Sequence, residues 1–174
     1  MTPHPRPRGR PVLSAACALV LAACAASDPQ AELAVSDLET YWAVDPSAGG
    51  TQYLAPVVRF RLQNKAARAR SIQATATFRR KGEAAAWSSA WQQVSPRPGS
   101  RPLAPGQTMV VTLKPEGEGR YSSTGAAESM FAHKDFKDVT AEVFLRVGSS
   151  AWAKFATSDV SRRLGSHRLE AAAP

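Results

Sequence analysis

The chain has 174 residues, a formal net charge of +8, three histidines and only two cysteines. Two cysteines exclude a small domain held together by several disulfides, and so few histidines and cysteines exclude a clustered zinc site. The length is that of one domain, whose core is large enough to fold without a metal or a disulfide.

The first 23 residues have the layout of an export signal. Three arginines, Arg6, Arg8 and Arg10, precede an apolar run over residues 12–23 that ends in small residues. This run is too short to span a bilayer as a mature helix. Charge, then an apolar core, then small residues is the order typical of a cleaved signal peptide. We therefore expect residues 1–23 to be removed.

The end of this run resembles the lipobox of bacterial lipoproteins. A leucine stands three positions before a cysteine, with two alanines between them, in the sequence Leu21-Ala22-Ala23-Cys24. The resemblance implies that Cys24 is thioether-linked to diacylglycerol and becomes the acylated first residue of the mature chain. It also implies that Ala25 permits transfer to the outer membrane. The alternatives are an ordinary cleaved signal with a free thiol, or a buried apolar helix.

The second cysteine lies inside the apolar run. Cys17 has no leucine or valine three positions before it, so it does not fit the lipobox and leaves with the signal. The mature chain then holds no cysteine pair for an intramolecular disulfide, and its fold depends on its core.

Beyond a short lipidated tether over residues 24–32, apolar and polar residues alternate with the period of two that predicts β-strands. The clearest case is residues 57–63, where Val58, Phe60 and Leu62 alternate with polar residues that include two arginines. The predicted strands cover residues 33–44, 57–63, 72–78, 84–94, 109–113, 139–147 and 151–157. The segment 84–94 is also compatible with a helix.

Turn residues separate the predicted strands. Residues 65–69 make a turn after Asn64, and residues 104–107, Ala-Pro-Gly-Gln, suit a type II turn because Gly106 accepts a positive φ. The long connection over residues 115–138 contains one helix-compatible stretch, residues 126–134. Residues 148–150 form the turn of a terminal hairpin, and residues 161–174 are expected to form a flexible tail.

Seven short strands without alternating helices predict one all-β domain over residues 33–160. Its expected architecture is an immunoglobulin-like two-sheet β-sandwich with one short helix in a long loop. Residues 57–113 resemble small sandwich domains of bacterial envelope lipoproteins whose function is uncharacterised. This resemblance covers about a third of the chain and rests on turn residues, so it implies only fold and setting.

Patterns for catalysis and metal binding are weak. Ser129, His133 and Asp135 lie close together in the sequence, but no nucleophile-elbow motif accompanies them, and residues of one short segment rarely converge as a triad requires. Asp135 and Asp138 do not follow the calcium-loop pattern. We therefore expect no catalytic, cofactor-binding or metal-binding residues, and an exposed turn of helix around His133.

Basic residues dominate one part of the chain. Between residues 59 and 101, ten lysines and arginines accompany a single acidic residue, Glu83. If the strands at 57–63 and 72–78 pair as a hairpin, their arginines share one solvent face that attracts anions. The candidate residues for an anionic partner are Arg59, Arg61, Arg79 and Arg80. The alternative is that these arginines only keep the sandwich soluble and its edges unpaired.

The four tryptophans leave two interpretations open. Trp42, Trp87, Trp91 and Trp152 could line a groove for a carbohydrate or a peptide, because an indole ring stacks well and donates one hydrogen bond. They could instead fill the sandwich core or cover its open end, which is the commoner use. Trp87 and Trp91 are expected to share one face of their segment.

Together these features predict a non-catalytic binding or assembly module of the cell envelope. Acylated Cys24 would hold it on the periplasmic side of the outer membrane. The expected partners, besides the membrane itself, are an acidic envelope protein or anionic lipid headgroups. Nucleic acid is not expected, since outward aromatic residues for base stacking are not evident. The alternative function is a small envelope hydrolase that uses residues near His133.

Overall fold

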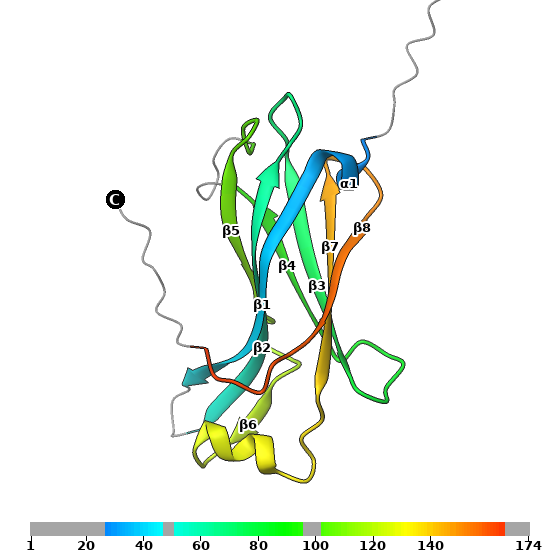
Figure 1. Ribbon diagram of the computed structural model, residues 1–174. Coiled ribbons are helices and arrows are strands. Elements are labelled where there is room, and N and C mark those ends of the chain that lie inside the picture. Colours follow the sequence, from blue (N-terminus) through cyan, green and yellow to red (C-terminus); the bar gives the residue numbers. More distant parts are fainter. Residues whose placement is uncertain (1–26, 47–50, 96–101, 166–174) are drawn as a thin grey trace, which may run out of the picture.

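The computed structural model describes residues 27–46, 51–95 and 102–165. Within these ranges, eight strands form two antiparallel sheets of four strands that pack face to face (Figure 1). The first sheet has the order β1-β2-β5, with β6 also paired to β2, and the second has the order β4-β3-β7-β8. The predicted all-β, immunoglobulin-like two-sheet sandwich is confirmed.

In the described ranges, the chain forms eight strands and two short helices. The strands are β1 (Leu33–Pro46), β2 (Gln52–Asn64), β3 (Ile72–Arg80), β4 (Ser88–Val94), β5 (Thr108–Leu113), β6 (Tyr121–Ser123), β7 (Val139–Val147) and β8 (Ala153–Asp159). The helices are α1 (Pro29–Glu32) and the 3₁₀-helix η1 (Ala127–Ala132). None of the helices in the described ranges is long and apolar enough to cross a bilayer.

Alternation of apolar residues positions the core between the sheets. Val58, Phe60 and Leu62 of β2 are buried, and β7 alternates buried and half-buried residues along its whole length. Because successive side chains of a strand point to opposite faces, this period places one face of each sheet in the core. The strand predictions for β2, β3, β5 and the β7–β8 hairpin are therefore confirmed.

The neighbours of the strands differ from the sequence-based expectation. β2 and β3 do not pair as a hairpin, because β2 pairs with β1 and β5 while β3 pairs with β4 and β7 in the other sheet. The turn after Asn64 thus carries the chain from one sheet to the other. The short β6 was not anticipated, and β4 begins at Ser88 rather than at residue 84.

The predicted type II turn before β5 is present. The backbone N–H of Gln107 donates to the carbonyl oxygen of Ala104 at 3.1 Å. Gly106 has a φ of 71°, which a residue with a side chain rarely adopts.

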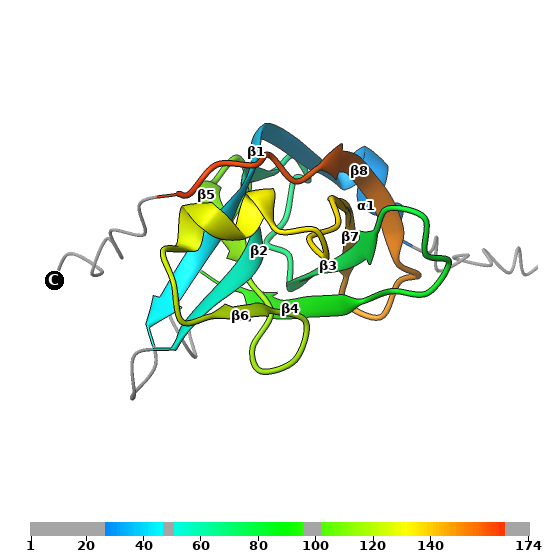
Figure 2. The same ribbon diagram turned by 90° about the horizontal axis from the view of Figure 1, so that it is seen from below.

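The sandwich has two distinct ends. One end holds α1 and the β2–β3 turn, and we call it the α1 end; the opposite end holds β6 and η1, and we call it the η1 end (Figure 1). Seen from below, η1 and the chain around it lie across the η1 end (Figure 2).

Polar contacts hold the α1 end together. Asp28 caps α1 by accepting a hydrogen bond from the backbone N–H of Gln30 at 3.0 Å. The carbonyl oxygen of Glu32 accepts from the backbone N–H of Lys65 at 2.8 Å, and the Glu32 carboxylate pairs with Arg70. Part of the expected tether is therefore a helix fixed to the β2–β3 turn.

Asn64 is the buried polar residue of this end. Its side-chain nitrogen donates to the carbonyl oxygens of Arg68 and Leu103, both at 2.9 Å. Its side-chain oxygen accepts from the backbone N–H of Ala66 at 3.0 Å. One amide side chain thus satisfies backbone groups of two loops that would otherwise be buried without partners.

The chain after β8 returns to the edge of the first sheet. Leu164 forms a parallel bridge with Trp42 of β1, and two backbone hydrogen bonds of 2.9 Å flank it. A Cβ atom added at Gly165 would come within 2.1 Å of the Tyr41 ring. Residues 161–165 therefore differ from the expected flexible tail, whose remainder lies outside the described residues.

Candidate binding pocket at the η1 end

Five aromatic rings close the η1 end of the sandwich. Fully buried Trp42 of β1 lies at the centre. Its ring centroid is 5.2 Å from that of Phe136 and 5.8 Å from that of Tyr121. Trp87 and Phe131 complete the cluster at 6.4 and 6.3 Å from Trp42. The tilted and edge-on arrangements are those that aromatic quadrupoles favour.

Arg80 covers this aromatic cluster from the end of β3. Its guanidinium carbon lies 4.4 Å from the Trp87 ring centroid and 5.2 Å from that of Tyr121. A cation over an aromatic face is attracted by the ring quadrupole. Arg80 thus helps to cover the η1 end of the sandwich. Its Nη1 atom also lies 4.0 Å from Oε1 of Glu83.

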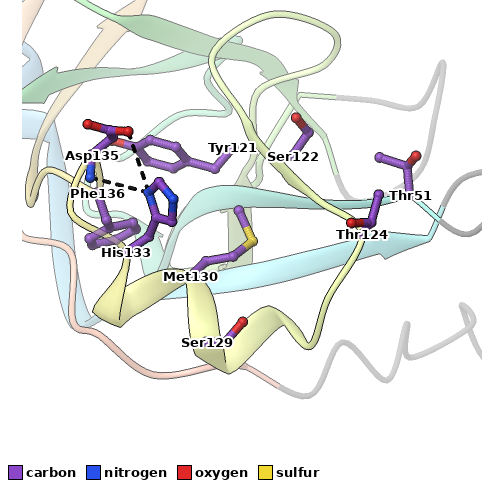
Figure 3. A pocket seen from close by; sticks show the side chains of 9 residues that line it. All are labelled: Thr51, Tyr121, Ser122, Thr124, Ser129, Met130, His133, Asp135 and Phe136. Carbon is purple, nitrogen blue, oxygen red and sulfur yellow. Dashed lines mark hydrogen bonds and ion pairs between the residues drawn. The ribbon is translucent and has the colours of Figure 1, made fainter.

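A pocket opens beside the aromatic cluster, between β6, η1 and the loop that follows η1 (Figure 3). Its volume is about 540 Å³, which is within the range of small-molecule sites. It is lined by Thr51, Tyr121, Ser122, Thr124, Ser129, Met130, His133, Asp135 and Phe136. The lining therefore joins hydroxyl groups and one carboxylate to two aromatic rings and a thioether.

The three residues weighed as a catalytic triad all line this pocket, but they are not arranged as a triad. Nδ1 of His133 accepts a hydrogen bond from the backbone N–H of Asp135 at 3.3 Å (Figure 3). The same Nδ1 lies 3.7 Å from Asp135 Oδ2, and among the described residues no hydrogen bond joins His133 to Ser129, as a triad requires. The Ser129 hydroxyl donates instead to the carbonyl oxygen of Ala126 at 2.6 Å.

The four arginines proposed as an anion-binding surface do not share one face. Arg59 and Arg61 lie on the outer face of the first sheet, while Arg79 lies on the outer face of the second sheet. Arg80 is at the η1 end over the aromatic cluster. The expectation of one common surface is therefore wrong, because it required β2 and β3 to pair.

Each of these arginines also has an acidic neighbour. Arg59 lies 3.7 Å from Glu39, and Arg61 lies 3.0 Å from Asp37, on the adjacent strand β1. Arg79 lies 3.6 Å from Glu142 on β7. The basic excess in the sequence window is thus offset by carboxylates that other strands bring alongside.

Ion pairs shift several carboxyl groups. A hydrogen bond from Arg162 lowers the pKa of Asp138, to which Arg162 Nε and Nη2 donate at 2.6 and 3.0 Å. Hydrogen bonds from Lys137 and Lys154 likewise lower the pKa values of Glu83 and Glu142. These carboxyl groups are half-buried at the surface and each pairs with a basic side chain, so the pairs tie surface segments together rather than create a reactive site.

The tryptophans divide between the core and the surface. Trp42 and Trp87 pack in the aromatic cluster, whereas Trp91 on β4 is 60% exposed and Trp152 is 38% exposed beneath the guanidinium of Arg146. The expectation that Trp87 and Trp91 share a face is wrong, because Trp87 precedes β4 and turns into the sandwich end.

Two further predictions concern a metal site and the lipid-attachment residue. In the described ranges, no group of three or more histidine, cysteine or acidic residues is placed to hold a metal ion. Cys24, the predicted lipid-attachment residue, lies outside the described residues, three positions before Ser27.

Comparisons with known proteins give no family. No family model matches the chain, and no curated protein matches it. A β-glucuronidase from glycoside hydrolase family 2 aligns with a TM-score of 0.39 and 12% identity, over 70% of this chain and 10% of that one. This chain thus spans about a tenth of the length of that enzyme.

Two smaller solved structures align over most of their own length. The structural genomics target SoR45 has a TM-score of 0.38 and 10% identity, over 77% of this chain and 89% of that one. The putative ApaA protein from Bordetella pertussis has a TM-score of 0.36 and 15% identity, over 75% and 93%. Similarity at this level carries no argument about function.

Proposed function

We propose that the protein is a lipoprotein of the bacterial outer membrane whose β-sandwich acts in the periplasm as a non-catalytic binding or assembly module. The observation that carries the proposal is the sequence Leu21-Ala22-Ala23-Cys24 at the end of a basic and apolar leader. An acylated cysteine with more than one chain anchors a protein firmly, whereas a single chain binds only marginally.

The start of the folded body supports a defined orientation at the membrane. α1 begins at Pro29, five residues after Cys24, and an extended chain of that length reaches at most about 18 Å. Since α1 is fixed to the β2–β3 turn by Glu32, the α1 end lies beside the bilayer. The η1 end and its pocket then face away from the membrane (Figure 1).

Two exposed cations of the β2–β3 turn suit a place at the membrane surface. Lys65 and Arg68 are exposed at the α1 end, and neither forms an ion pair with another described residue. Each basic residue near an anionic surface contributes about 1 kcal/mol. In this proposal they contact lipid headgroups, a role for which the four paired arginines on β2 and β3 are less suited.

The pocket favours binding over hydrolysis. A hydrolase around His133 would need a base facing the Ser129 hydroxyl, but His133 Nδ1 accepts from Asp135 and the hydroxyl donates elsewhere. The hydrolase alternative is tested by His133→Ala. A hydrolytic activity of the purified protein that this variant abolishes would replace the binding proposal.

The anchor is tested by expressing the native gene with its signal and determining the mass of the N-terminal peptide. We expect the mature chain to begin at acylated Cys24 and to fractionate with the outer membrane. Cys24→Ser should abolish acylation, while the matched variant Cys17→Ser should leave it unchanged. A mature chain that begins elsewhere, or acylation lost equally in both variants, would overturn the anchor.

The partner is identified in the same cells by crosslinking and mass spectrometry. A specific protein captured by the wild type favours an assembly module. Capture of lipid alone, reduced when Lys65 and Arg68 are both changed to Gln, favours headgroup contact.

A further inference from the structure

We propose that the pocket at the η1 end binds a neutral saccharide. The inference deepens the proposed function by naming the ligand class of the binding module, and it rests on that function only for the ligand's location in the envelope. Its basis is the chemistry of the lining residues in Figure 3.

Hydroxyl groups surround the opening from several elements. Ser122 and Thr124 come from β6 and the chain after it, Ser129 comes from η1, and Thr51 is the residue before β2. A hydroxyl both donates and accepts hydrogen bonds. It therefore matches a sugar, whose own hydroxyls do the same. Ser129 already donates to Ala126, so it offers its lone pairs to a ligand.

Apolar surface lies next to these hydroxyls. Met130 is buried against the core, and the half-buried rings of Tyr121 and Phe136 form part of the lining. The Tyr121 hydroxyl donates to and accepts from the backbone of Lys137, at 3.3 and 3.1 Å. Its ring is thus held in place by contacts outside the pocket. The C–H face of a sugar packs on such rigid apolar surface, while its edge hydroxyls reach polar groups.

The charges at the pocket favour a neutral ligand over an anionic one. Its lining contains the Asp135 carboxylate and no lysine or arginine. Lys137, in the following loop, is paired with Glu83 at 2.7 Å, and Arg162 is paired with Asp138. Within the lining, His133 is the one residue that can carry a positive charge, and its Nδ1 already lies 3.7 Å from the Asp135 carboxylate. An anionic ligand would meet that carboxylate, whereas Asp135 can accept hydrogen bonds from neutral sugar hydroxyls.

The test uses the full-length protein purified from membranes in detergent. It is screened against an array of neutral oligosaccharides built from glucose, galactose, mannose and N-acetylglucosamine. The best ligand is then titrated by calorimetry. We expect a dissociation constant of about 1 mM or tighter for at least one of them. Inorganic phosphate and choline serve as anionic and cationic probes, and we expect neither to bind.

Matched variants locate the binding. Thr124→Val removes a pocket hydroxyl while keeping the side-chain shape, and Asp135→Ala removes the carboxylate. We expect each to weaken binding by about tenfold. Thr157→Val makes the same change at an exposed position of β8, outside the pocket, and should alter the affinity by less than about twofold. Thermal unfolding of each variant checks that it remains folded.

Three results would overturn the inference: no sugar on the array binds, phosphate or choline binds instead, or the affinity is unchanged in both pocket variants. The N-terminal mass of the same preparation separates this failure from failure of the anchor. Acylated protein that binds no sugar contradicts only the saccharide site, and unacylated protein that binds sugar contradicts only the anchor.

Discussion

The two ends of the sandwich are closed by different chemistry. At the α1 end, the buried Asn64 amide satisfies backbone groups of two loops, and an ion pair joins Glu32 to Arg70. At the η1 end, aromatic rings pack around Trp42 beneath the guanidinium of Arg80. Hydrogen bonds are directional and fix loop geometry. Ring packing fills volume and involves few polar groups that need partners.

The difference has a consequence for where a ligand can bind. A buried polar network must be satisfied completely, so the α1 end leaves little freedom for side chains to meet a ligand. The η1 end rests on apolar contacts, and its hydroxyl groups at the pocket are exposed beside them. The η1 end is thus better suited to recognition, and the α1 end, beside the proposed anchor, to rigid attachment.

The largest effect is expected from removing the centre of the aromatic cluster. Trp42→Ala leaves a cavity among four rings and should lower the free energy of unfolding by about 3–5 kcal/mol in urea titrations. Trp91→Ala, on the exposed outer face of β4, is the matched control and should change it by less than about 0.5 kcal/mol. An equal loss of unfolding free energy in the two variants would contradict the central role of Trp42 in packing the η1 end.

The counterpart at the α1 end is Asn64→Ala. It strands the carbonyl oxygens of Arg68 and Leu103 and the N–H of Ala66 without their side-chain partner. We expect a loss of about 2–3 kcal/mol in the same titrations, since buried groups left unsatisfied carry their desolvation penalty. Gln63→Ala, the exposed neighbour on β2, should cost less than about 0.5 kcal/mol. A neutral Asn64→Ala would show that water replaces the amide.

A smaller effect should follow from removing the cation over the rings. Arg80→Met keeps the apolar stem but loses the attraction to Trp87 and Tyr121, at a cost of about 1 kcal/mol. Arg79→Met is the control, because Glu142 keeps its contact with Lys154 and an exposed pair contributes little, about 0–1 kcal/mol. If both variants lose the same stability, the position of Arg80 over the rings has no special effect.

The smallest effect concerns the ion pair that ties the chain after β8 to the η1 end. Arg162 lowers the pKa of Asp138 in the folded protein. The stabilisation is therefore present above the unfolded pKa of about 4 and is lost as the pH falls through the lower folded value. Asp138→Asn should cost less than about 1 kcal/mol at neutral pH.

This difference between Asp138→Asn and the wild type should disappear in acid. Urea titrations at about pH 7 and at successively lower pH values below about 4 measure it, because the difference fades as the pH falls through the lowered pKa of folded Asp138. Glu128→Gln, an exposed change on η1, should show no such dependence. A deficit of Asp138→Asn that persists unchanged at the lower pH would mean that the charge of Asp138 is not what matters.

Sequence patterns predicted the faces of the strands but not their neighbours. The alternation of Val58, Phe60 and Leu62 requires a strand with one buried face, and the structure has it. The same alternation is satisfied by any partner strand, so it could not show that β2 pairs with β1 rather than β3. This error placed Arg59 and Arg79 on one face. Counting charge along the sequence then missed Glu39 and Glu142, which lie far away along the chain.

The pocket was only partly visible in the sequence. Ser129, His133 and Asp135 were considered as a candidate triad because their side chains are those of hydrolases, and they do line one pocket. Their orientations depend on local hydrogen bonds, such as that from the Asp135 N–H to His133, which no spacing reveals. Thr51 and Tyr121 join them through the pairing of β6 with β2, a three-residue strand too short to give a periodic signal.

Strand β1, near the start of the described chain, is bonded to residues near its end. Thr40 donates to the carbonyl oxygen of Asp159 at 2.8 Å, and Trp42 is bridged by Leu164. The edge of the first sheet is therefore complete only after Leu164 has been made, and such non-local pairing is slow. If the chain is exported as we propose, slow completion of this edge leaves more time for it to cross the membrane unfolded.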